Sequence, residues 1–187
     1  MRVPLVVLLA LLLVAPMAHA GDQSDPEITD GSFPTDPALM ALRGDTTAGA
    51  PEIDIQAVWL STNATDVTVT WEVLDGTHRL QANETILYSL AFDCGTRTYT
   101  LDVEENPDGR SYGHLQGVNS VVNVTFDGNL ITAGTGRAYF PCATLTHLHA
   151  SSILLLQTSP TTWWGGGTVW WRDVAPAQGY GRDFTFG

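Results

Sequence analysis

The chain has 187 residues and a formal net charge of −12, and all eight of its Lys+Arg positions are arginine. A surface this acidic repels phosphate backbones, which argues against nucleic acid as a partner and favours calcium, cationic proteins or a saline medium. The length is enough for one domain with a hydrophobic core.

Residues 1–20 have the pattern of a secretory signal peptide. Arg2 gives a positive start, an apolar run follows, and Ala18-His19-Ala20 forms a small-residue cleavage site. An uncleaved membrane anchor is the alternative, but the apolar run is shorter than the roughly 20 residues that a spanning helix needs. We therefore expect cleavage after Ala20, a secreted or cell-surface protein and no transmembrane segment.

Residues 21–52 form an acidic leader that is rich in proline and glycine. Within it, Asp36 suits a helix N-cap, Pro37 the first helical position and Gly44 the stop, which predicts one or two helical turns.

The predicted domain covers residues 53–187, where apolar and polar residues alternate as in β-strands. In 66–75, Val67, Val69, Trp71 and Val73 share one face of the chain. Strands are expected at 53–61, 66–75, 84–93, 96–105, 110–115, 120–128, 130–134, 137–141 and 151–159, separated by turn signals such as Asp75-Gly76, Asp108-Gly109 and Asp127-Gly128.

Eight or nine short strands without crossover helices are typical of an all-β protein, an antiparallel β-sandwich of immunoglobulin-like or jelly-roll-like topology. At most one or two short helices are expected, one of them around 142–148.

Two cysteines, Cys94 and Cys142, are present in this exported chain, and an even pair in an oxidising compartment predicts a disulfide. Closing a loop of this size stabilises the fold by about 4 kcal/mol in the chain-entropy model.

Both ends of the predicted mature chain carry motifs that resemble a known module. The segments "GDTTAGAPEIDIQAVWLSTNATDVTVTWEVLD" (44–75) and "WRDVAPAQGYGRDFTFG" (171–187) resemble the opening and the close of a β-sandwich module found in secreted archaeal and bacterial proteins. Broadly, the chain is similar to the DOMON and family 9 carbohydrate-binding sandwiches, which bind haem or sugars and sometimes calcium.

The resemblance implies a calcium ion that ties the leader to the last strand. Its ligands would come from Asp45, Asp54 and Asp173, with Asp30, Asp36 and Asp183 as further candidates. Calcium takes six to eight oxygen ligands, which carboxylates and loop carbonyls supply. The alternative is that these aspartates are turn residues and strand-end charges that keep the protein in solution.

No catalytic motif is present, so the sequence does not predict an enzyme. On a regular strand His147 and His149 would share a face and form a metal-binding edge, but neither an HExxH nor a GxSxG motif accompanies them.

Three N-x-[ST] sequons mark candidate glycosylation sites at Asn63, Asn83 and Asn123, which predicts surface positions if the host glycosylates exported proteins. Asn123 and Thr125 are expected on one exposed face of a strand.

Four tryptophans, Trp163, Trp164, Trp170 and Trp171, flank three consecutive glycines at 165–167. The glycines allow a sharp reversal, so the two pairs could form the arms of a hairpin. Their rings could close one end of the core as a lid, dock on a protein surface or stack on sugar rings.

These features predict an exported, non-catalytic β-sandwich that binds or adheres at the cell surface or outside the cell, with calcium as a stabilising ion. The partner would be a surface protein or a glycan. A carbohydrate-binding module that uses residues 161–173 is the alternative, and a secreted hydrolase is a distant third.

Overall fold

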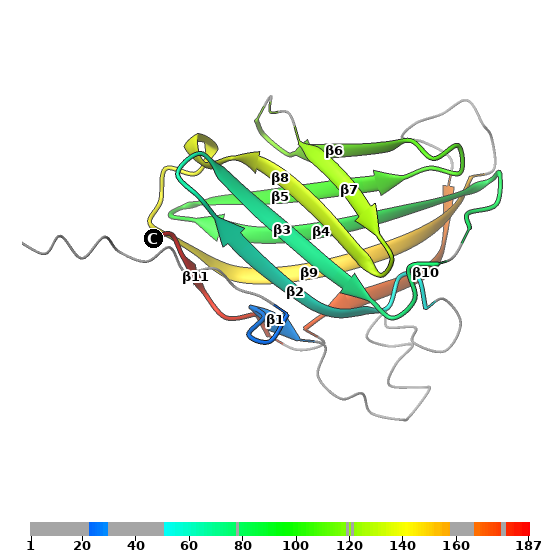
Figure 1. Cartoon of the computed structure of the whole chain (residues 1–187), viewed down its shortest axis with the longest axis horizontal. Helices are drawn as coiled ribbons and strands as arrows, with labels where there is room; N and C mark the ends of the chain where they lie inside the picture. Colours follow the sequence, from blue (N-terminus) through cyan, green and yellow to red (C-terminus); the bar gives the residue numbers. More distant parts are fainter. Residues whose placement is uncertain are drawn as a thin grey trace, which may run out of the picture.

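A computed structural model describes residues 23–29, 51–77, 79–118, 120, 122–157, 167–176 and 179–187 (Figure 1). The predicted signal peptide, the predicted helix at 36–44 and most of the leader lie outside these residues. In the described part of the chain, no helix is long and apolar enough to cross a membrane.

Two antiparallel sheets pack face to face. The first has the order β1-β2-β3-β8-β7 and the second the order β10-β9-β4-β5-β6, with β11 paired to β9. The first sheet contains β1 (Ile28–Thr29), β2 (Ile55–Thr62), β3 (Asp66–Val73), β7 (Asn123–Asp127) and β8 (Leu130–Gly136). The second contains β4 (Glu84–Cys94), β5 (Arg97–Glu105), β6 (Ser111–Leu115), β9 (Thr144–Gln157), β10 (Gly167–Ala175) and β11 (Phe184–Thr185).

The strand order is that of a variable-type immunoglobulin domain. Strands β2-β3-β8-β7 correspond to A-B-E-D, and β10-β9-β4-β5-β6 correspond to G-F-C-C′-C″. The expected all-β sandwich is therefore confirmed, with the immunoglobulin-like of the two topologies considered.

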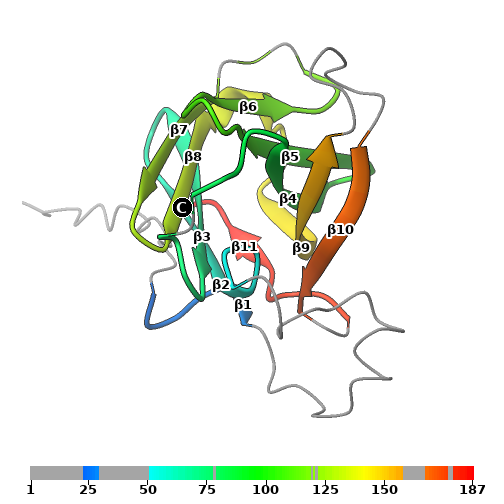
Figure 2. The same ribbon diagram turned by 90° about the vertical axis from the view of Figure 1, so that its right-hand side faces the viewer.

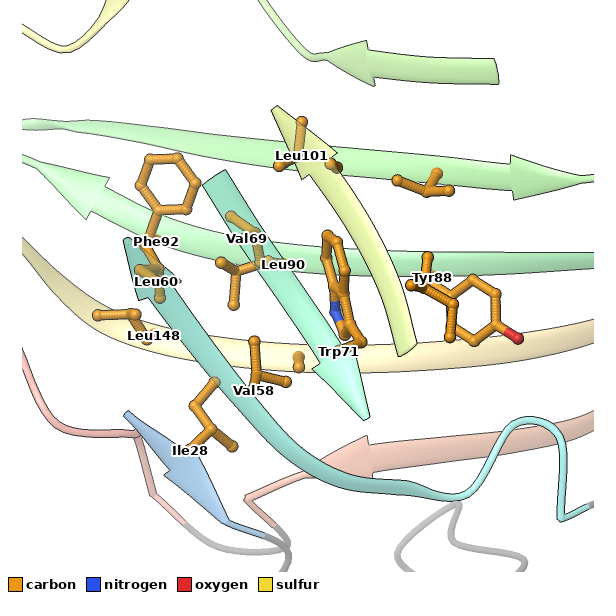
Figure 3. Close-up of a cluster of buried hydrophobic side chains, with 14 of the residues drawn as sticks. Ile28, Val58, Leu60, Val69, Trp71, Tyr88, Leu90, Phe92, Leu101 and Leu148 are labelled. Carbon is orange, nitrogen blue, oxygen red and sulfur yellow. The ribbon is translucent and has the colours of Figure 1, made fainter. Parts of the chain in front are cut away.

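The core lies between the sheets, and strands such as β3 and β4 bury alternate side chains in it. Val67, Val69, Trp71 and Val73 of β3 are all buried, as their alternation predicts. Figure 3 shows the indole of Trp71 among the core side chains, which include Tyr88 and Leu90 of β4. A buried side chain of this size is among the largest single contributions to a core.

The disulfide between Cys94 and Cys142 is confirmed, with a Cα–Cα distance of 5.4 Å. It joins the last residue of β4 to the segment before β9, whereas immunoglobulin domains of antibodies link strands B and F. Next to it, the rings of Phe92, Tyr99 and Phe140 contact one another with centroids 5.5–5.8 Å apart.

Two expectations along residues 137–159 are wrong. The segment 137–141 is not a strand but starts with a 3-10 turn, Arg137–Tyr139, in which the Arg137 guanidinium donates to the carbonyls of Phe140 and Cys142. Strand β9 begins at Thr144, so no helix forms at 142–148. Strand β9 contains a bulge at His147, whose φ is 54°. The bulge places the buried residues of this segment at positions 145, 148 and 150, and this spacing resembles that of a helix more than the period of two of a regular strand.

Candidate functional site

One end of the sandwich, on the right in Figure 1, gathers several connections between strands. Because neighbouring strands are antiparallel, β3, β5 and β7 end there, and β2, β4, β6 and β8 begin there. We call this the loop end, and its described residues are 51–54, 74–77, 79–83, 106–110 and 128–129. In a variable-type domain the corresponding end carries the antigen-binding loops. Figure 2 views the molecule from this end, with the two sheets on opposite sides.

Carboxylates at the loop end accept hydrogen bonds from nearby backbone groups. Asp75 accepts from the N–H of Thr77 at 2.8 Å, Glu84 from that of Gln81 at 2.7 Å, and Asp108 from that of Arg110 at 3.0 Å. Such local bonds give loops a defined shape without regular secondary structure. These acids therefore build the turns that surround the site.

A pocket of about 40 Å³ opens between the sheets at the loop end. Its wall contains two carboxylates, a phenol, one further aromatic ring and apolar side chains. Glu52 is buried and Glu105 is half-buried. The complete lining is Glu52, Gly76, Ile86, Tyr88, Glu105, Phe126, Gly128 and Ile131.

Two turn glycines make one wall of this pocket. A Cβ atom on Gly76 would lie only 1.8 Å from the carbonyl oxygen of Gly128, and Gly128 itself has a φ of +58°. Only glycine allows such a close backbone approach. The Asp75-Gly76 and Asp127-Gly128 signals of the sequence thus bring the β3–β4 loop and the β7–β8 turn into contact.

Tyr88 forms the inner wall of the pocket, and its hydroxyl donates to the carbonyl oxygen of Glu52 at 3.0 Å. Burial raises the pKa of this phenol well above its ordinary value, and the carboxylates of Glu105 and Glu52 raise it further. Tyr88 is therefore neutral at physiological pH and serves as a hydrogen-bond donor.

Tyr88 belongs to a row of three neighbouring residues on the second sheet, in which Tyr88 pairs with Ser152 and Ser152 with Asp173. We call these three residues the polar row. Their side chains bind the backbone of residues 52–55, since Ser152 donates to the carbonyl of Ile53 and Asp173 accepts from the N–H of Ile55. The polar row thereby fixes the chain that enters β2 and the pocket wall that contains Glu52.

Of the three aspartates predicted to bind calcium, Asp45 lies outside the described residues, and Asp54 and Asp173 are both buried. Asp54 accepts a hydrogen bond from the Gln56 side chain, and Asp173 belongs to the polar row. Among the further candidates, Asp30 and Asp36 are not described and Asp183 is exposed. The described residues contain no group of three or more His, Cys, Asp or Glu side chains that could hold a metal ion. Calcium binding stays a prediction.

The tryptophan segment is described only in part. Trp163 and Trp164 lie outside the described residues, and for Trp170 and Trp171 the structure gives the backbone, which is part of β10. Strand β10 pairs antiparallel with β9, and in this pairing Gly167 lies opposite Gln157 and Trp171 opposite Leu154. A register shift falls between Val169 and Trp171.

His147 and His149 do not lie on the regular strand that would place them on one face, because His147 occupies the bulge. Its Nδ1 lies 2.9 Å from Oδ2 of Asp93, and its ring contacts that of Tyr180 in a tilted arrangement with centroids 4.6 Å apart. Asp93 also accepts from the hydroxyl of Thr98 at 2.6 Å. The imidazole is thus oriented by a carboxylate on the face of the second sheet.

The asparagines of the three sequons, Asn63, Asn83 and Asn123, are all exposed. The side-chain oxygen of Asn63 accepts a hydrogen bond from the N–H of Thr65 at 2.8 Å. This bond in the β2–β3 turn uses the amide oxygen, so it is compatible with a glycan on the amide nitrogen.

Sequence reasoning did not identify the pocket. Its residues come from segments as far apart as 52 and 131, and only the pairing of the sheets brings them together. The two Asp-Gly turns were the available signal, but they indicate turns and not which turns touch.

No family model, curated protein or solved structure matches this chain.

Proposed function

We propose that this protein is an exported, non-catalytic binding or adhesion module that contacts its partner with the loop end. The observation that carries this proposal is the pair of exposed apolar side chains next to the two touching turns, one just after β3 and one near the end of β7. Leu74 is 54% exposed and Phe126 is 37% exposed, and Phe126 also lines the acidic pocket. Large apolar groups beside a small polar pocket are typical of the centre of a protein interface.

Export is supported by the sequence pattern of residues 1–20 and by the disulfide, since disulfides persist in oxidising compartments. The three exposed sequon asparagines fit the same environment.

A non-catalytic role is supported by the hydrogen bonds of two side-chain hydroxyl groups in the second sheet. The hydroxyls of Ser89 and Thr98 donate to the carboxylates of Asp102 and Asp93, and these contacts join neighbouring strands. A Ser or Thr nucleophile would instead need its hydroxyl directed at a base such as histidine.

Carbohydrate binding is the second candidate. It is favoured by the strand order, because β9 ends at the loop end and β10, the strand that contains Trp170 and Trp171, begins there. Aromatic faces commonly bind sugars by stacking, and a glycan array with the secreted protein tests this candidate.

The main proposal is tested by the binding of fluorescently labelled secreted protein to intact cells of its source. A variant with Leu74→Ala and Phe126→Ala should lose about tenfold or more in affinity, since central interface residues commonly contribute 2 kcal/mol or more. Tyr180→Ala is the matched control, because Tyr180 is 62% exposed and its ring contacts His147 instead of lining the pocket. Equal binding by all three proteins, or binding by none, would contradict the proposal.

A further inference from the structure

The size of the loop-end pocket restricts what can enter it. Its volume is about 40 Å³. Pockets that enclose whole organic ligands measure about 300–1,000 Å³, so neither a sugar ring nor a cofactor fits. A few water molecules or the tip of one side chain can be accommodated.

The charge of the pocket wall restricts the occupant further. Glu52 lines it from the segment that precedes β2 and Glu105 from β5, so two carboxylate residues line the same small space. Their charges raise the pKa of the Tyr88 phenol, which lines the same pocket. An anionic group would be repelled there, and a cationic group would be attracted.

The remaining lining is unsuited to a bare metal ion. Calcium needs six to eight oxygen ligands, whereas Ile86, Ile131 and Phe126 supply apolar walls. Apolar and aromatic surfaces do suit the planar guanidinium group and the methylene stem of a long cationic side chain. The exposed side chains of Leu74 and Phe126 would then contact the rest of the partner around this anchor.

We propose that the loop-end pocket binds the guanidinium or ammonium tip of an arginine or lysine side chain of a cationic partner protein. This inference rests on the proposed function, because it specifies the chemistry of the partner that the loop end contacts. The chain itself has a net charge of −12 and no lysine, so the attraction to a cationic protein is also long-range.

The test is an NMR titration of the ¹⁵N-labelled secreted protein with Nα-acetyl-arginine amide and Nα-acetyl-lysine amide. The backbone amide signals of Gly76 and Gly128 report on the pocket wall. Nα-acetyl-citrulline amide has nearly the shape of the arginine probe without its charge, and it is the matched ligand control. We expect saturable shifts at both glycines with a cationic probe and no saturable shift with citrulline.

Two variants separate the pocket from general electrostatics. Glu105→Gln should weaken binding of the cationic probe about tenfold, because it removes a charge-assisted contact. Glu104→Gln removes the same charge from the neighbouring residue, which does not line the pocket, and should change the affinity less than about twofold. If Glu105→Gln does not fold, the salt dependence of arginine binding to the native protein decides, since sodium chloride must weaken a charge-driven site.

Equal shifts with arginine and citrulline, no saturable shift with either cationic probe, or equal effects of the two variants would overturn the proposal. These outcomes are distinct from failure of the proposed function. If the cationic probe binds but labelled protein does not bind cells, the pocket assignment stands and the adhesion role falls. If cells bind the protein through Leu74 and Phe126 but neither cationic probe binds the pocket, only the pocket assignment is wrong.

Discussion

The carboxylate of Asp173 lies 2.7 Å from the backbone nitrogen of Ile55 and accepts its hydrogen bond in the interior of the protein. Asp173 belongs to β10, an edge strand of the second sheet, and Ile55 is the first residue of β2, so this bond joins the two sheets. An unpaired backbone N–H is costly to bury, and a carboxylate satisfies it with a charge-assisted bond.

Replacing this acceptor should therefore destabilise the fold. Asp173→Ala leaves the Ile55 N–H without its partner, and we expect the free energy of unfolding to fall by about 1–3 kcal/mol. Asp173→Asn keeps an oxygen at this place and should cost less. Urea denaturation of both variants measures the difference, with Asp183→Ala as an exposed control. A loss no larger than that of the control would contradict the assignment of Asp173 to the polar row.

Tyr88 makes the stability depend on pH in alkaline solution. Its pKa in the folded protein is raised above the value of about 10 that holds in the unfolded chain. Above pH 10 the unfolded chain therefore releases the phenolic proton first, and the free energy of unfolding falls as the pH rises. Tyr88→Phe should reduce this slope, whereas Tyr180→Phe, at an exposed position, should not. Parallel slopes for the native protein and Tyr88→Phe, measured by denaturation between about pH 9 and 11, would refute this prediction.

The carboxyl group of Asp93 should make the stability depend on pH in acidic solution. The Thr98 hydroxyl lowers its pKa most, and the hydrogen bond and charge of His147 lower it further. A depressed folded pKa stabilises the protein above the unfolded value of about 4, and this contribution is lost as the pH falls through the folded pKa. Thr98→Val should raise the pKa of the Asp93 carboxyl in an NMR titration. An unchanged pKa in this variant would show that the Thr98 bond is not formed in solution.

Calcium is the remaining prediction from the family resemblance. A site present only in the folded protein raises the apparent stability by about 2.7 kcal/mol when calcium exceeds its dissociation constant a hundredfold. Melting temperatures in calcium and in chelator should differ, and Asp54→Asn should remove the difference. Melting curves that coincide across millimolar calcium would count against the site.

The regular strands of this fold could be predicted because the buried positions repeat with a period of two. Val67, Val69, Trp71 and Val73 are the clearest case, and all four are in the core. The start of β9 could not be predicted, since the bulge at His147 interrupts that period within the strand. The pocket was beyond sequence reasoning for a different reason. Glu52, Tyr88 and Phe126 meet only after the two sheets pack, and no local pattern encodes which loops will touch.

The central claim is that the loop end is the surface that contacts the partner. The most direct measurement is photo-crosslinking on intact cells, with benzoylphenylalanine in place of Phe126 in one protein and in place of Tyr180 in another. Both positions are exposed, but only Phe126 lines the loop-end pocket. Our account predicts a covalent adduct with a cell-surface component from position 126 and none from position 180. Adducts from position 180 alone, or none from 126 while the protein remains bound to cells, would contradict it.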